Sequence, residues 1–203
     1  KAQVQSKVKI DGLAGPSELM ALCDNKQPIE WLALDALAQS EHDPMALSVL
    51  VSDDRQWLGN VEQFLQSDEK YRVLIDKQQV VLLLANDISD MIATSNQFAA
   101  EHLMLCDERI SPEQLTHYGS LFIGANSAVA MGDYCSGPNH TLPTLGYARQ
   151  TGGLNVQAFL RILTTQKIND DGRTKLAEMA MPLANEEGLA FHYQSLKVRV
   201  NND

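Results

Sequence analysis

Short apolar runs alternate with amphipathic segments from about residue 19 to about residue 126. The apolar runs predict five short strands: Leu19–Cys23, Ala46–Val51, Val80–Leu84, His102–Leu105 and Leu121–Gly124. Apolar residues at helical spacing predict four helices: Ile29–Ser40, Gln56–Leu65, Ile88–Phe98 and a segment near Pro112–Tyr118. Because strands alternate with helices of about ten residues, we expect βαβ units and a parallel sheet, which is an α/β fold.

The helix over Ile29–Ser40 has the clearest pattern. Pro28 stands at its expected start, where the missing backbone N–H of proline costs little. Trp31, Leu34 and Leu37 fall on one face at helical spacing.

The pattern changes after about residue 126. Ser127–Gly153 is rich in Gly, Pro, Ser, Thr and Asn without a clear period, and a polar loop of this length is usually functional. The rest of the chain has helical spacing over three segments: Val156–Leu163, Gly172–Leu183 and Leu189–Val198. Pro182 and Gly188 are expected to interrupt it. We therefore expect two domains, over 1–153 and 154–203, the second a helical tail.

Composition narrows the class of protein. The chain has 203 residues, 44% of them hydrophobic, which is enough to bury a sizeable core. The formal net charge is −10 and no basic stripe is present, so we expect no nucleic-acid partner. No apolar run is long enough to span a bilayer, and residues 1–14 lack the apolar core of a signal peptide, so we expect no membrane partner.

The cysteines and the common sequence motifs add two further points. Cys23, Cys106 and Cys135 are odd in number and lack CxxC spacing, which is typical of reduced thiols in a cytoplasmic protein. There is no G-x-G-x-x-G, no Walker loop and no G-x-S-x-G, so no residue of this chain is assigned to cofactor binding.

Four of the five histidines stand in short polar clusters that contain a carboxylate or an amide. The clusters are Gln39-Ser-Glu-His42, Glu101-His102, Asp133-Tyr-Cys-Ser-Gly-Pro-Asn-His140 and Glu187-Gly-Leu-Ala-Phe-His192. Imidazole beside carboxylate is the chemistry of a metal site or of acid/base catalysis. His117 has no acidic neighbour within three residues.

Each of the first two clusters also has a purely structural interpretation. Gln39 and His42 lie three apart at a helix end and could share a metal such as Zn²⁺ or Mn²⁺, or His42 could interact with the last carbonyls of the helix. Glu101 and His102 open a strand, where neighbours point to opposite faces, so a simple contacting pair is not expected. Both could still reach one bound water or substrate at the strand edge; otherwise Glu101 lies on the surface.

The remaining clusters have similar alternatives. Asp133 and His140 lie in the long polar loop, where a functional role and a structural one are both open. Glu187 and His192 straddle an expected helix start, and the alternative for them is a solvated helix face.

Several motifs of the chain resemble those of the histidinol dehydrogenase family. They are Ala14-Gly-Pro-Ser-Glu18, Gln39-Ser-Glu-His-Asp-Pro44, Ser95-Asn-Gln-Phe-Ala-Ala-Glu-His-Leu103, Gly132-Asp-Tyr, Gly137-Pro-Asn-His-Thr-Leu-Pro-Thr144 and Glu187-Gly-Leu-Ala-Phe-His192. They follow the family's order from about residue 10 to the end, and Gly-Pro-Asn-His-x-Leu-Pro-Thr is highly specific. The resemblance implies a Rossmann-like sheet and a zinc enzyme that oxidises L-histidinol to L-histidine, with two hydride transfers to NAD⁺.

The resemblance also assigns roles to residues. It implies that zinc is held by four of them: Gln39, His42, Asp133 and His192. It places the acid/base pair at Glu101 and His102, and it gives His140 only a supporting role. The substrate's polar groups would be bound by seven residues: Ser17, Gln39, His42, His102, Asp133, Glu187 and His192. It further implies a homodimer in which the C-terminal segment completes the partner's active site.

The main departure from the family is length, because the family's chains are roughly twice as long. We expect a fragment that lacks the N-terminal half, including most residues that contact NAD, and that has no dehydrogenase activity alone. The alternative is a short paralogue that binds metal and ligand without turnover, and a weaker one is a structural remnant.

Overall fold

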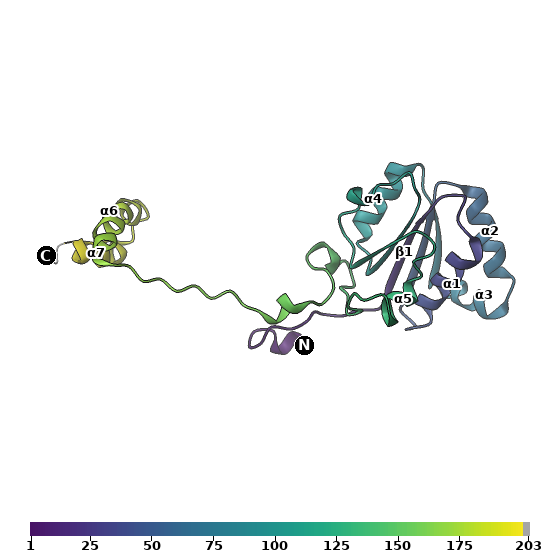
Figure 1. The fold of residues 1–203 in the computed structure, drawn as a ribbon, viewed down its shortest axis with the longest axis horizontal. Coiled ribbons are helices and arrows are strands. Elements are labelled where there is room, and N and C mark those ends of the chain that lie inside the picture. Colours follow the sequence, from purple (N-terminus) through teal and green to yellow (C-terminus); the bar gives the residue numbers. More distant parts are fainter. Residues whose placement is uncertain (201–203) are drawn as a thin grey trace. The chain divides into compact units, whose positions relative to one another are not determined.

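The computed structural model describes residues 1–200 of the chain (Figure 1). Contacts divide the chain into two compact units, Lys1–Leu160 and Arg161–Asp203, and each is described by itself. Within residues 1–200, no helix has the length and apolar character needed to cross a membrane.

The first unit is built on a parallel sheet of five strands in the order β3-β2-β1-β4-β5. The strands are β1 (Glu18–Cys23), β2 (Leu47–Ser52), β3 (Val80–Leu84), β4 (His102–Cys106) and β5 (Ser120–Ile123). Each differs from its predicted range by no more than one residue at either end. The prediction of an α/β fold with a parallel sheet is confirmed.

Helices cover both faces of this sheet (Figure 1). They are α1 (Ile29–Ser40), α2 (Arg55–Gln66), α3 (Glu69–Asp76), α4 (Ile88–Phe98) and α5 (Val129–Tyr134). The first three and α5 pack on one face, and α4 packs on the other. Asp54, Asp68 and Asp87 begin α2, α3 and α4 by accepting a backbone N–H of the first turn, which satisfies an otherwise unpaired donor.

The buried face of α1 differs from the face that its spacing suggested. The range Ile29–Ser40 is confirmed, but Trp31 is 52% exposed and Leu34 is 41% exposed. The core is met instead by a stripe centred on small residues, with Leu32 and Ala36 fully buried. Small side chains allow the helix to approach the sheet closely, and a pattern that counts only large residues misses them.

Two predicted helices are wrong. Near Pro112–Tyr118 only a 3₁₀ turn forms, at Pro112–Gln114, because Asn96 of α4 accepts the N–H of Thr116 and donates to the carbonyl of Gln114. These bonds hold the segment extended against α4.

In the second case, Val156–Leu163 has only a 3₁₀ turn at Val156–Phe159. The side chains of Phe159 and Ile162 are 78% and 95% exposed, so this segment buries no apolar face that could stabilise a helix.

Two short helices were not predicted. Helix α3 has only eight residues; Tyr71, Leu74 and Ile75 lie at helical spacing and pack partly buried on the core, but the stripe is too short to stand out in the sequence. Helix α5 lies inside the polar loop, and of its residues only Val129 is buried. Helices this short depend on their contacts for stability, which a local pattern does not reveal.

The second unit is a helical hairpin of α6 (Asp170–Glu186) and α7 (Ala190–Val200). The hairpin is reversed at Gly188, whose φ of 70° is the left-handed conformation that glycine adopts readily. Pro182 was expected to interrupt this region, but it lies inside α6. The carbonyl that loses its helical partner there belongs to Glu178, which is exposed to water.

Candidate functional site

The residues of the site gather at the amino-terminal ends of two neighbouring strands. Glu18 opens β1 and His102 opens β4, and the register pairs Leu19 with His102. Ser17 and Glu101 immediately precede these strands. Two segments that are far apart in sequence are thereby brought side by side by strand pairing alone.

The carboxylate of Glu101 is the centre of this cluster. Its Oε2 accepts a hydrogen bond from the hydroxyl of Ser17 and one from the backbone N–H of Glu18, at 3.0 Å. Gln39, in the last turn of α1, donates its amide Nε2–H to the hydroxyl oxygen of Ser17. Nδ1 of His102 lies 3.5 Å from the same Oε2. Gln39, Glu101 and His102 are all buried.

Glu101 and His102 therefore do contact each other, and the expectation that they would not is wrong. The alternation of side chains applies within a strand, whereas Glu101 stands at a bend before β4 begins. It is thus free to point toward the ring of its neighbour.

The surroundings of His102 fix which ring nitrogen carries the hydrogen. Nδ1 lies 3.2 Å from the backbone carbonyl of Glu18, and a carbonyl can only accept a hydrogen bond. We therefore assign the hydrogen of the neutral ring to Nδ1, which leaves Nε2 as the basic nitrogen. Nε2 lies 3.8 Å from Oδ1 of Asp133. An imidazole held in this way by a carboxylate and a carbonyl is suited to general-base catalysis.

Helix α5 brings Asp133 to this ring by packing closely on Phe122 of β5. A Cβ atom at Gly132 would lie 2.6 Å from Cζ of Phe122, so only glycine fits there. The ring of Phe122 in turn lies against His102, with ring centroids 5.9 Å apart.

The predicted metal ligands are only partly brought together. Gln39 and Asp133 lie in the cluster around His102, whereas His42 is exposed just beyond α1. Within residues 1–200, the side chain of His42 makes no hydrogen bond or ion pair, and no group of three or more His, Cys, Asp or Glu is placed to hold a metal. The donors themselves, an amide oxygen, imidazoles and a carboxylate, form a mixed N/O set of the kind that suits zinc.

The other predicted residues lie in the loop and in the second unit. The side chain of His140 is exposed. Glu187 follows the end of α6 and His192 lies in the first turn of α7. Both line a largely apolar hollow of about 600 Å³ between these two helices, together with exposed Leu183 and Phe191.

Glu18 is a site residue that was not singled out from the sequence, although it belongs to the quoted motif Ala14-Gly-Pro-Ser-Glu18. Its side chain is buried, and Oε1 accepts the backbone N–H of Leu145 at 3.0 Å. Burial raises the pKa of Glu18, and the nearby charge of Glu101 adds to this, while the backbone N–H groups of Leu145 and Glu101 oppose it. The sequence contained one signal for Glu18: it is an acidic residue directly after Ser17, which was itself predicted as a site residue.

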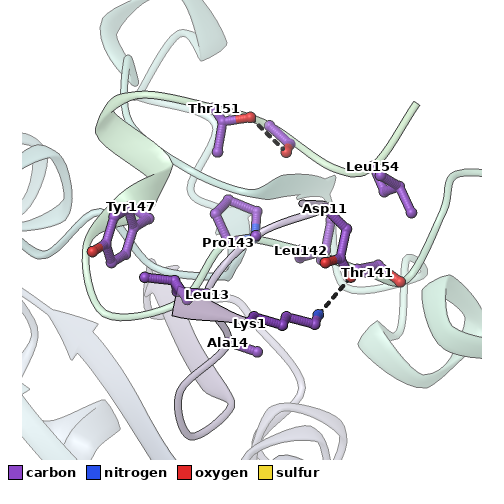
Figure 2. A pocket seen from close by; sticks show the side chains of 12 residues that line it. Lys1, Asp11, Leu13, Ala14, Thr141, Leu142, Pro143, Tyr147, Thr151 and Leu154 are labelled. Atoms are coloured by element: carbon purple, nitrogen blue, oxygen red, sulfur yellow. Dashed lines mark hydrogen bonds and ion pairs between the residues drawn. The ribbon is translucent and has the colours of Figure 1, made fainter. Parts of the chain in front are cut away.

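The polar loop packs beside this strand end, on the segment that precedes β1. The N–H of Gly15 donates to Oγ1 of Thr144 at 2.6 Å. Figure 2 shows Leu13 and Ala14 lining one small pocket with Pro143 and other residues of the loop. The loop is therefore held to the same end of the sheet as the cluster around Glu101.

Comparisons with known proteins agree on one family. A family model described as histidinol dehydrogenase matches residues 1–200. Histidinol dehydrogenase of Natronomonas pharaonis is 39% identical over 208 residues, which cover 98% of this chain and 49% of that protein. Histidinol dehydrogenase of Methanosarcina mazei is 40% identical over 206 residues, covering 98% and 48%.

The fold is also similar to a solved structure. The crystal structure of histidinol dehydrogenase from Elizabethkingia anophelis has a TM-score of 0.79 and 33% sequence identity, covering 94% of this chain and 46% of that one. The chain thus spans about half the length of the relatives that it matches.

Proposed function

The chain belongs to the histidinol dehydrogenase family, and from this premise we propose that the protein oxidises L-histidinol to L-histidine in histidine biosynthesis. The reaction consumes one water and two NAD⁺ and yields two NADH and three protons. The observation that carries the proposal is the contact of His102 with both Glu101 and the carbonyl of Glu18, which leaves Nε2 as a base.

In this proposal His102 removes the proton of the substrate hydroxyl through Nε2 while hydride leaves the carbon. Glu101 stabilises the imidazolium that results, because its carboxylate lies 3.5 Å from Nδ1. For the second oxidation the same pair activates a water for attack on the aldehyde-level carbon. NAD⁺, when bound, accepts the hydride in each step.

Four residues are proposed to hold zinc: Gln39, His42, Asp133 and His192. The ion would supply charge that orients the imidazole and the amine of histidinol. Ser17, beside Gln39, is proposed to bind a polar group of the substrate, and Glu187 to bind its ammonium group. Glu187 and His192 are proposed to act in the site of a second copy of the chain, which makes the active form a homodimer.

The function is tested on the full natural chain, supplied with zinc, NAD⁺ and L-histidinol at mildly alkaline pH. NADH should form, and His102→Asn should lower kcat by about 10²-fold to 10⁴-fold, because the base is lost. His117→Asn is the matched control, since Nδ1 of His117 contacts the backbone carbonyl of Asn96 in α4 and not the cluster around Glu101. Wild-type protein that forms no NADH would disprove the proposal.

The zinc ligands are tested by metal content. Zinc bound per chain should fall severely in His42→Ala, because removal of one ligand from a four-ligand site weakens binding, and should change little in His117→Ala. Equal losses in the two variants would refute this ligand set.

A further inference from the structure

Glu18 connects three parts of the site. Its backbone N–H binds the carboxylate of Glu101, and its backbone carbonyl binds Nδ1 of His102. Its side chain binds the N–H of Leu145, which is 127 residues away in sequence. One residue therefore orients both members of the acid/base pair and also holds the polar loop.

The loop has an unusual backbone where Glu18 holds it. Leu145 has a φ of 55° and Gly146 a φ of 74°, and the left-handed conformation is unfavourable for a leucine. The side chain of Leu145 lies against Gly15 but is 62% exposed, so its burial contributes little to holding this conformation. The hydrogen bond from its N–H to Glu18, together with the bond between Gly15 and Thr144, fixes this turn.

Burial of the Glu18 carboxylate costs folding free energy. Within residues 1–200, its Oε2 is buried and makes no hydrogen bond. A buried carboxylate with an unpaired oxygen costs free energy that an apolar side chain of similar size would not. Such a group is expected where it serves the site rather than stability.

We propose that Glu18 is a positioning residue, which fixes the loop segment Thr141–Gly146 to the strand end that carries Glu101 and His102. This inference rests on the proposed function for its kinetic consequence. The loop follows α5, which carries Asp133, so fixing it at Leu145 limits the movement of both the loop and Asp133 relative to His102.

The experiment compares Glu18→Met with Glu18→Gln in the full natural chain. Methionine fills the same space but cannot accept the N–H of Leu145, whereas glutamine can. Glu62→Met and Glu62→Gln, at an exposed position of α2, are matched controls. Three quantities are measured: amide hydrogen exchange of the Leu145 segment, the thermal midpoint, and kcat and KM for L-histidinol.

Exchange at Leu145 should be about tenfold or more faster in Glu18→Met and close to wild type in Glu18→Gln. In Glu18→Met, kcat should fall about tenfold or more with little change in the thermal midpoint, and Glu18→Gln should restore most of it. Unchanged exchange at Leu145 in Glu18→Met would overturn the proposal. So would a loss of kcat that Glu18→Gln does not restore.

The two proposals can fail separately. If the wild-type protein does not oxidise histidinol, the proposed function fails, while the exchange measurement still decides whether Glu18 holds the loop.

Discussion

The missing side chain at Gly132 sets how closely α5 approaches β5. Phe122 lies under this glycine, and its ring also contacts His102. The distance of 3.8 Å between Oδ1 of Asp133 and Nε2 of His102 therefore depends on the absence of a Cβ atom at Gly132.

Gly132→Ala should destabilise the first unit by about 1–3 kcal/mol, because the added methyl group overlaps the ring of Phe122. It should also reduce histidinol oxidation by more than its loss of stability explains, since Asp133 moves with α5. Gly59→Ala in α2 is the control, because a Cβ there meets nothing within 4 Å. Urea unfolding and steady-state kinetics measure the two effects, and equal behaviour of both variants would contradict the account.

At the scale of single residues, the sequence predicts which residues gather at the candidate site better than it predicts how their side chains contact each other. Ser17, Gln39, Glu101, His102 and Asp133 were all predicted as site residues, and the structure brings them together. The contact between Glu101 and His102 was not predicted, because it depends on the exact residue at which β4 begins.

Among the elements, α5 depends on an acidic residue of α1. Asp35 is 9% exposed, and the backbone N–H of Val129, the first residue of α5, favours its charged form. Burial outweighs this and raises the pKa of Asp35 to about 6. The carboxylate is thus held in an environment that disfavours its charge.

The raised pKa makes the stability of the first unit depend on pH. Because the folded state holds the proton more tightly, the free energy of unfolding should fall as pH rises from about 4 to about 6, by up to about 3 kcal/mol. Asp35→Asn should remove this dependence and make the protein more stable near pH 7, since asparagine can still accept the N–H of Val129. Urea unfolding, followed by fluorescence of Trp31 and Trp57, measures it.

The control for this prediction is Asp76→Asn, which changes an exposed acid at the end of α3. The role of Asp35 would be disproved if the difference in unfolding free energy between the wild-type protein and Asp35→Asn were the same at both ends of this pH range.

Elements with a strong apolar pattern were predicted well, and short ones were not. β3, α1 and α4 have the ranges that their sequences predict. Helix α5 was missed because it has only six residues and because Gly132 and Asp133 interrupt its apolar pattern. Polar or small residues at a functional site interrupt the apolar pattern from which a helix or strand is predicted.

For the whole molecule, the proposal that sites are shared between copies makes a strict prediction. A His42→Ala chain and a His192→Ala chain, both full length, should each be inactive. Mixed after subunit exchange, they should regain about a quarter of wild-type sites by random pairing, because each heterodimer has one intact site and one doubly defective site.

Neither variant should regain activity when only mixed with itself. Proven exchange of subunits without recovery would mean that His192 serves the site of its own chain.

The position of the site at the amino-terminal edge of the sheet has an electrostatic consequence. Helices that connect parallel strands run back to this edge, so α1 ends beside Gln39 and α4 ends at Phe98, shortly before Glu101. The terminal carbonyls of a helix carry about half a negative charge, which attracts cations and repels anions. Phosphate groups of nucleotides bind at the opposite edge of such sheets, where helices begin. This end of the molecule instead favours a small positive ligand, such as an ammonium group, an imidazolium or a divalent metal ion.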